Sequence, residues 1–146
     1  MSKCSDSYDL KVLFSSDHDF IQLEGINQLD LCGKKVECKI GKTEVTSSEY
    51  LLGKILLGDN SDNIDKVFKG VGQKKVIALI KDKNKLKLML TENQEAARQF
   101  QLNKKLISFS EIPEDLVKTI SEAFNKAVYN NDVINEDNGF SNIAWL

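Results

Sequence analysis

Residues 58–75 constrain the fold more than any other part of this chain, because they join two helical patterns through a segment unsuited to a helix. Apolar residues recur at helical spacing up to Gly58, a residue type that often ends helices. A second amphipathic pattern begins near Gln73. The segment between them is rich in aspartate, asparagine and glycine, which favour turns. The sequence therefore predicts two helices joined by a tight polar loop.

Helical patterns also occupy most of the chain on either side of this segment. Thr46 and Glu49 have the spacing of a capping box, which predicts the start of the first helix. Two further helices are expected over residues 83–90 and 92–105, and another after Pro113. The positions expected to face inward in residues 92–105 are Ala96, Ala97, Phe100 and Leu102. The apolar positions expected after Pro113 are Leu116, Val117, Ile120, Phe124 and Val128.

The N-terminal part has β patterns instead. Residues 10–14 form a short apolar run that predicts a buried strand of the parallel kind, ending in a polar loop. Residues 28–32 and 35–40 predict a hairpin that turns at Gly33. We therefore predict an α/β fold that is mostly α. Residues 1–45 would form the truncated edge of a parallel α/β sheet with a β-hairpin, and residues 46–146 a helical domain.

The C-terminal end is expected to leave this helical pattern. Residues 106–109 form a short apolar stretch that predicts a connector, and residues 130–139 are polar and predict a spacer. We expect the last residues, 140–146, to dock on the helical domain, because an exposed Trp145 would forgo favourable burial. A tail that binds a partner is the alternative.

Composition narrows the class of protein. The chain has 146 residues, of which 41% are apolar and 29% charged, as in soluble globular proteins. No apolar run approaches the ~18 residues of a membrane span, and the first residues do not resemble a signal peptide, so we expect a cytoplasmic protein. Three cysteines and one histidine make a zinc site improbable. Any metal is expected to be Mg²⁺ or Mn²⁺, bound by oxygen atoms.

Charge is distributed unevenly, although the net charge is only −2. Residues 66–87 contain eight lysines and one acid, whereas residues 111–139 are mainly acidic. This asymmetry predicts a basic patch on an otherwise acidic protein. The alternative is that these lysines only solvate the exposed faces of helices.

Two pairs of aspartates are candidate cation ligands. Asp17 and Asp19 follow the first predicted strand, where side chains two residues apart point the same way. Asp59 and Asp62 are three residues apart near a helix C-terminus, where the helix dipole disfavours negative charge unless a cation is bound. A loop or helix cap would also explain the first pair, and ordinary turn chemistry the second. If the fold brings all four together, they can form a two-metal site for phosphodiester hydrolysis.

The segment from Gly70 to Gly72 is a candidate phosphate-binding element. Glycines allow the backbone to approach a phosphate closely, and the helix that follows presents free N–H groups at its start. Lys74 and Lys75 add positive charge. A cation site beside a phosphate-binding element suggests a nuclease.

These residues resemble the motifs of the flap-endonuclease and 5′-3′ exonuclease superfamily, most closely its T-even-phage RNase H type. Residues 16–23 are similar to the last eight positions of the family's S-x-D-x-D-x-x-Q-L strand end, and residues 54–64 contain its G-D-x-x-D-N-I motif. Residues 70–75 resemble its helix–three-turn–helix DNA clamp, and residues 103–113 the helical region of the phage branch. The first three motifs occur in the order found in the family.

The resemblance implies roles for individual residues. The implied metal ligands and catalytic residues are Asp17, Asp19, Asp59 and Asp62, holding two Mg²⁺ or Mn²⁺ ions. The implied DNA-binding residues are Lys69, Gly70, Val71, Gly72, Lys74 and Lys75, with K⁺ as a further candidate at the glycine hairpin. The implied substrate is duplex DNA or an RNA–DNA hybrid with a 5′ end or flap, processed during DNA replication.

The resemblance also implies that this chain corresponds to the C-terminal half of the family's fold. The family's N-terminal half supplies further acidic ligands and a helical arch, and residues 1–9 contain neither. We therefore expect the chain alone to be inactive or weakly active, and a separate polypeptide to supply the other half. One alternative is a non-catalytic module that binds duplex DNA without sequence preference, and another is a nonfunctional remnant. A phage-encoded protein of this kind would act in the cytoplasm of the infected cell.

Overall fold

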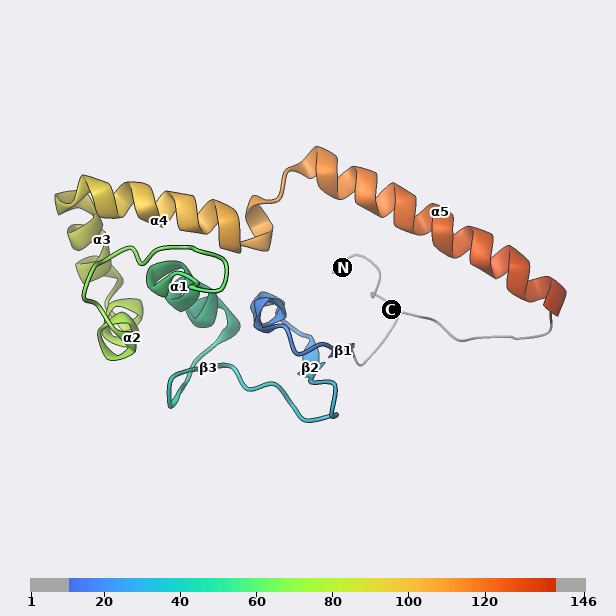
Figure 1. Ribbon diagram of the computed structural model, residues 1–146, viewed down its shortest axis with the longest axis horizontal. Coiled ribbons are helices and arrows are strands. Elements are labelled where there is room, and N and C mark those ends of the chain that lie inside the picture. Colours follow the sequence, from blue (N-terminus) through green and yellow to red (C-terminus); the bar gives the residue numbers. More distant parts are fainter. Residues whose placement is uncertain (1–10, 139–146) are drawn as a thin grey trace. The chain divides into compact units, whose positions relative to one another are not determined.

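The computed structural model describes residues 11–138, which are mostly helical with a small parallel sheet, as the sequence predicts (Figure 1). Contacts group these residues into two compact units, one ending at Ser108 and the other beginning at Phe109. The functional division predicted near residue 45 stays a prediction. Every predicted site residue belongs to the first unit.

The parallel sheet consists of two short strands. Strand β1 (Val12–Phe14) pairs in parallel with β2 (Asn27–Leu29), so that Val12 lies opposite Asn27. A 3₁₀ helix, η2 (His18–Gln22), lies in the connection between them. The predicted burial of β1 is wrong for Phe14, whose side chain is 63% exposed. Parallel sheets normally have both faces covered, and here Phe14 at the end of β1 is not covered.

The hairpin predicted over residues 28–40 forms only in part. A single antiparallel bridge joins Leu29 to Lys35. The carboxylate of Asp30 accepts hydrogen bonds from the backbone N–H groups of Cys32 and Lys34, so this segment folds as a compact turn. The regular ladder comes later, where β3 (Lys39–Ile40) pairs with β4 (Thr43–Glu44).

Four helices complete the first unit. The capping box predicted at Thr46 and Glu49 begins α1 (Ser47–Leu57), which ends at Gly58 as predicted. The other three helices are α2 (Gln73–Lys81), α3 (Lys83–Glu92) and α4 (Gln94–Ile107). Helix α1 contacts α2 and α4, and α3 contacts the same two helices (Figure 1). The buried core residues between these elements are Ile40, Leu56, Val67, Phe68, Val76, Leu79, Ile80, Leu86 and Ala96.

Helix α4 differs from its prediction in two ways. It continues through Ile107, where a connector was expected, because no helix-breaking residue interrupts it. Leu102 was predicted to face inward but is 49% exposed. The inward position next to it belongs to Asn103, which is fully buried at the same helical spacing as Ala96 and Ile107.

The second unit contains the 3₁₀ helix η3 (Phe109–Glu111) and the long helix α5 (Glu114–Asn138). The polar spacer predicted over residues 130–139 is therefore wrong up to Asn138, because polarity alone does not end a helix that contains neither glycine nor proline. The predicted docking of Trp145 lies outside the described residues. Within residues 11–138, no helix has the length and apolar character needed to span a membrane. The apolar positions of α5 that stay at least 40% exposed are Leu116, Val117, Ile120, Phe124 and Val128.

Candidate metal and phosphate site

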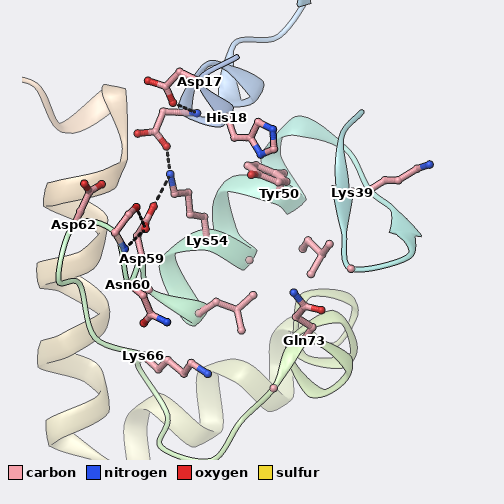
Figure 2. Close-up of a pocket in the computed structure, with 18 of the residues that line it drawn as sticks. Asp17, His18, Lys39, Tyr50, Lys54, Asp59, Asn60, Asp62, Lys66 and Gln73 are labelled. Atoms are coloured by element: carbon pink, nitrogen blue, oxygen red, sulfur yellow. Dashed lines mark hydrogen bonds and ion pairs between the residues drawn. The ribbon is translucent and has the colours of Figure 1, made fainter. Parts of the chain in front are cut away.

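All four predicted aspartates line one pocket of ≈ 980 Å³ (Figure 2). Asp17 and Asp19 come from the start of η2, and Asp59 and Asp62 from the loop that follows α1. The pocket also includes the glycine that precedes α2, Gly72. Pairs that lie forty residues apart in the sequence therefore share one concave surface.

The first pair does not have its predicted geometry. We expected Asp17 and Asp19 on an extended segment, but Asp17 is the N-cap of η2. Its Oδ1 accepts a hydrogen bond from the backbone N–H of Asp19 at 2.9 Å, so the Asp17 carboxylate caps this turn. The buried side chain of Gln28 fixes this turn, because its Nε2 donates to the backbone oxygens of Ser15 and Asp17, each at 2.7 Å.

The second pair lies on a closed loop that follows the end of α1. Gly58 has φ 67° and ψ −172°, a conformation open mainly to glycine, and it turns the chain out of α1. Asp59 and Ile64 then exchange two backbone hydrogen bonds, at 2.9 and 2.8 Å, which close the loop at its base. Asp62 lies at the exposed tip of this loop.

Asp59 is held in its charged form. Its Oδ1 accepts hydrogen bonds from the hydroxyl of Ser61 and, at 2.9 Å, from the backbone N–H of Ser61. The Ser61 hydroxyl is the largest influence that lowers the pKa of Asp59, and the nearby Lys54 adds to it, while burial opposes both. Because this pKa lies below its unfolded value, the interactions stabilise the fold at neutral pH and are lost as the pH falls through the folded-state pKa.

Lys54 connects the two pairs. Its Nζ lies 3.1 Å from Oδ2 of Asp59 and also contacts Oδ1 of Asp19, so one ammonium group lies between two carboxylates from different elements (Figure 2). The Lys54 side chain is only 16% exposed. It belongs to the last turn of α1, where the helix dipole favours a positive charge.

Asn103 fixes the base of the acidic loop from α4. Its Nδ2 donates to the backbone oxygen of Ile55 at 2.8 Å and to that of Asp65 at 2.7 Å. Ile55 lies one turn before the loop and Asp65 directly after it, so one side chain holds both ends. Gln99 supplies the remaining hydrogen bond, from its Nε2 to Oδ1 of Asn103.

The types of ligand atom suit a hard divalent cation, but the carboxylates are not gathered around one point. Carboxylate oxygens are the ligands that Mg²⁺ and Mn²⁺ prefer. Within residues 11–138, however, no three acidic, histidine or cysteine side chains lie close enough together to hold an ion. Of the four aspartates, only Asp19 and Asp59 contact a common cation, which is the ammonium of Lys54. Asp17 and Asp62 are exposed and line the same pocket.

The predicted phosphate-binding element lies at the edge of this pocket. Gly70 has φ 75° and lies in a turn closed by a hydrogen bond from the N–H of Val71 to the oxygen of Phe68. Gly72 is the N-cap of α2 and supplies no side-chain cap, so the start of this helix presents backbone N–H groups. The exposed lysines here are Lys74, Lys75 and Lys69, the last in a long, solvated contact with Glu95.

Sequence reasoning assigned no role to three residues that shape the site, Gln28, Lys54 and Asn103. Asn103 left a detectable signal, because it is a polar residue at a helix position shared with buried apolar ones. Lys54 falls within an apolar helical pattern and resembles an ordinary solvated lysine in the sequence. The contacts of Gln28 span more than ten residues and leave no local pattern.

Comparisons with known proteins bear on the fold alone. No protein-family model matches the sequence, and no curated protein matches it. Among solved structures, the chain is similar to T5 D15 protein, crystallised with metal ions, with a TM-score of 0.59 and 15% sequence identity. The match covers 82% of this chain and 54% of that one, so the chain spans about half the length of its structural neighbour.

Proposed function

We propose that this chain carries a metal and DNA-binding part of a 5′ nuclease that hydrolyses phosphodiester bonds. The observation that supports this most is the meeting of four aspartates and the uncapped start of α2 at one pocket. The fold likeness supports it as well, since T5 D15 protein is a 5′ exonuclease or flap endonuclease. The metal-binding and catalytic residues we propose are Asp17, Asp19, Asp59 and Asp62.

In this proposal each element of the pocket has a separate task. Bound Mg²⁺ or Mn²⁺ would supply an activated water and stabilise the leaving oxygen. The chain would hold a DNA strand beside the aspartates through the backbone N–H groups at the start of α2 and through nearby lysines. The residues proposed to bind the duplex are Lys69, Gly70, Val71, Gly72, Lys74 and Lys75, with K⁺ as a candidate ligand of the glycine turn.

The proposed substrates are RNA primers or 5′ flaps on duplex DNA, as in the T-even-phage RNase H type that the motifs resemble. The structural neighbour is nearly twice as long as the matched region. We therefore propose that a part of the fold beyond the matched region completes the active site. Exposure of Phe14 on β1 is consistent with a surface that a further part of the sheet would cover.

A second candidate function is a non-catalytic module that binds duplex DNA. Two observations favour it, namely the ammonium group between Asp19 and Asp59 and the lack of a three-carboxylate cluster in the described residues. In this case the glycine turn and lysines would keep their role, and the aspartates would have none in chemistry.

A cleavage assay distinguishes the two functions. We expect little Mg²⁺-dependent cleavage of a 5′-flap duplex by this chain alone, and clear cleavage once a polypeptide covering the unmatched half of the neighbour's fold is added. Asp62→Ala should abolish that cleavage while leaving duplex binding intact. Duplex binding without cleavage in either mixture would favour the binding module. Strong cleavage by the chain alone, lost in Asp62→Ala, would refute the need for a second polypeptide.

The proposed duplex contacts predict a specific dependence on salt. Lys74→Ala and Lys75→Ala should each weaken duplex affinity equally across sequences, because phosphate contacts carry no sequence information. Each should also reduce the slope of log K against log salt by about one unit. Fluorescence anisotropy at several salt concentrations measures this slope. Lys35→Ala, at an exposed lysine of the hairpin region, is the matched control. An unchanged slope for Lys74 and Lys75 would remove them from the interface.

A further inference from the structure

Among the residues that the structure describes, Lys54 is the one cation that contacts a carboxylate from each predicted aspartate pair, namely Asp19 and Asp59. Asp19 and Asp59 lie forty residues apart, on η2 and on the loop after α1. Their side chains are 33% and 19% exposed, so solvent screens them only in part. Two carboxylates drawn this close repel each other unless a positive charge lies between them.

The ammonium group of Lys54 therefore occupies the place that a cation would need in order to bridge Asp19 and Asp59. Lysine suits such a role because its charge is compact and its four-carbon stem is flexible, so the group can withdraw without disturbing the helix. A divalent ion that binds the same oxygens must first separate Lys54 from them. Because one set of carboxylate oxygens serves both cations, occupancy by one opposes occupancy by the other.

We infer that Lys54 is a tethered counter-ion that holds the Asp19–Asp59 pair closed in the metal-free protein and is exchanged for a divalent metal ion. This inference rests on the metal binding contained in the proposed function, but not on cleavage of DNA. It assigns Lys54 a positioning role, since it acts on the ligands and not on a substrate. Its consequence is that the chain keeps its acidic pocket assembled without metal, at the cost of weaker metal binding.

The test removes the charge of Lys54 and keeps its length. Lys54→Met should melt at a lower temperature than wild type in EDTA, because Asp19 and Asp59 then repel without a counter-ion. Saturating Mn²⁺ should raise the melting temperature of Lys54→Met most of the way to that of wild type. Calorimetric titration should show Mn²⁺ binding about tenfold tighter than in wild type, since no bound ammonium has to be displaced.

Lys66→Met is the matched control. Lys66 lines the same pocket, is exposed, and within residues 11–138 has no acidic partner. This variant reports how strongly a positive charge in the pocket repels Mn²⁺ without contacting its ligands. It should change the affinity for Mn²⁺ about twofold at most, because exposed charges are strongly screened. Lys54→Arg, which keeps the charge, should retain the wild-type melting temperature in EDTA.

The outcomes are separable. A Lys54→Met protein that binds Mn²⁺ no more tightly than Lys66→Met, or whose lost stability Mn²⁺ does not restore, would show that Lys54 is only a structural ion pair. If Lys54→Met does not fold in EDTA, the inference requires Mn²⁺ to drive its folding, and failure to fold with Mn²⁺ overturns it. A chain that passes these tests but cleaves no DNA even with the added polypeptide keeps this inference and loses the nuclease proposal. No Mn²⁺ binding by wild type or Lys54→Met overturns both.

Discussion

Gly58→Ala is expected to lower the free energy of unfolding by about 3 kcal/mol or more, because it combines a forbidden backbone conformation with a collision. At φ 67° and ψ −172°, Gly58 occupies a region in which residues with a side chain are strained. A Cβ atom there would lie 2.3 Å from the backbone oxygen of Ile64 and 2.6 Å from that of Asp65. Backbone atoms cannot rotate away as a flexible side chain can, so the acidic loop has to move. Urea denaturation measures the loss.

Gly33→Ala is the comparison for a positive φ without a collision. Gly33 also has a positive φ, 77°, but an added Cβ would meet no atom within 4 Å. Its substitution should cost about 1–2 kcal/mol, the usual penalty for a left-handed residue. Equal losses at Gly58 and Gly33 would mean that the contact between Gly58 and the end of the loop is unimportant. A larger loss at Gly58 is expected, because the collision adds to a backbone conformation that is open mainly to glycine.

Local signals in the sequence were sufficient to predict the helical half of the fold. The capping box at Thr46 and Glu49, the stop at Gly58 and the start near Gln73 each depend on neighbouring residues, and all three are confirmed. The burial predicted for β1 failed because it depends on distant contacts. The strand at Phe14 was taken as buried from its apolar character, but burial depends on what covers the sheet.

The site was less predictable than the fold, for the same physical reason. Residue types identified the aspartates as candidate ligands, and the loop at Asp59 follows from turn-forming residues. The arrangement of Asp17 could not be predicted, because capping of η2 competes with the extended conformation assumed for it. The contacts of Lys54 with Asp19 and of Asn103 with Ile55 join residues more than thirty positions apart, and no periodic pattern encodes them.

Neutralising Asp59 and Asp62 together should weaken Mn²⁺ binding about 100-fold or more, since loss of the residues that only orient metal ligands already costs 10- to 100-fold. The double variant Asp59→Asn, Asp62→Asn keeps side-chain size and removes two negative charges from the pocket. Ser61 can still donate to an amide oxygen at position 59, which favours retention of the loop. Asp65→Asn is the matched control, because Asp65 directly follows the same loop but does not line the pocket.

Calorimetric titration of Mn²⁺ into wild type, the double variant and Asp65→Asn tests most directly whether the aspartates that meet in this pocket form a cation site. The account predicts saturable binding by wild type and by Asp65→Asn, and almost none by the double variant. Equal affinity in all three proteins, or no binding by wild type, would contradict it.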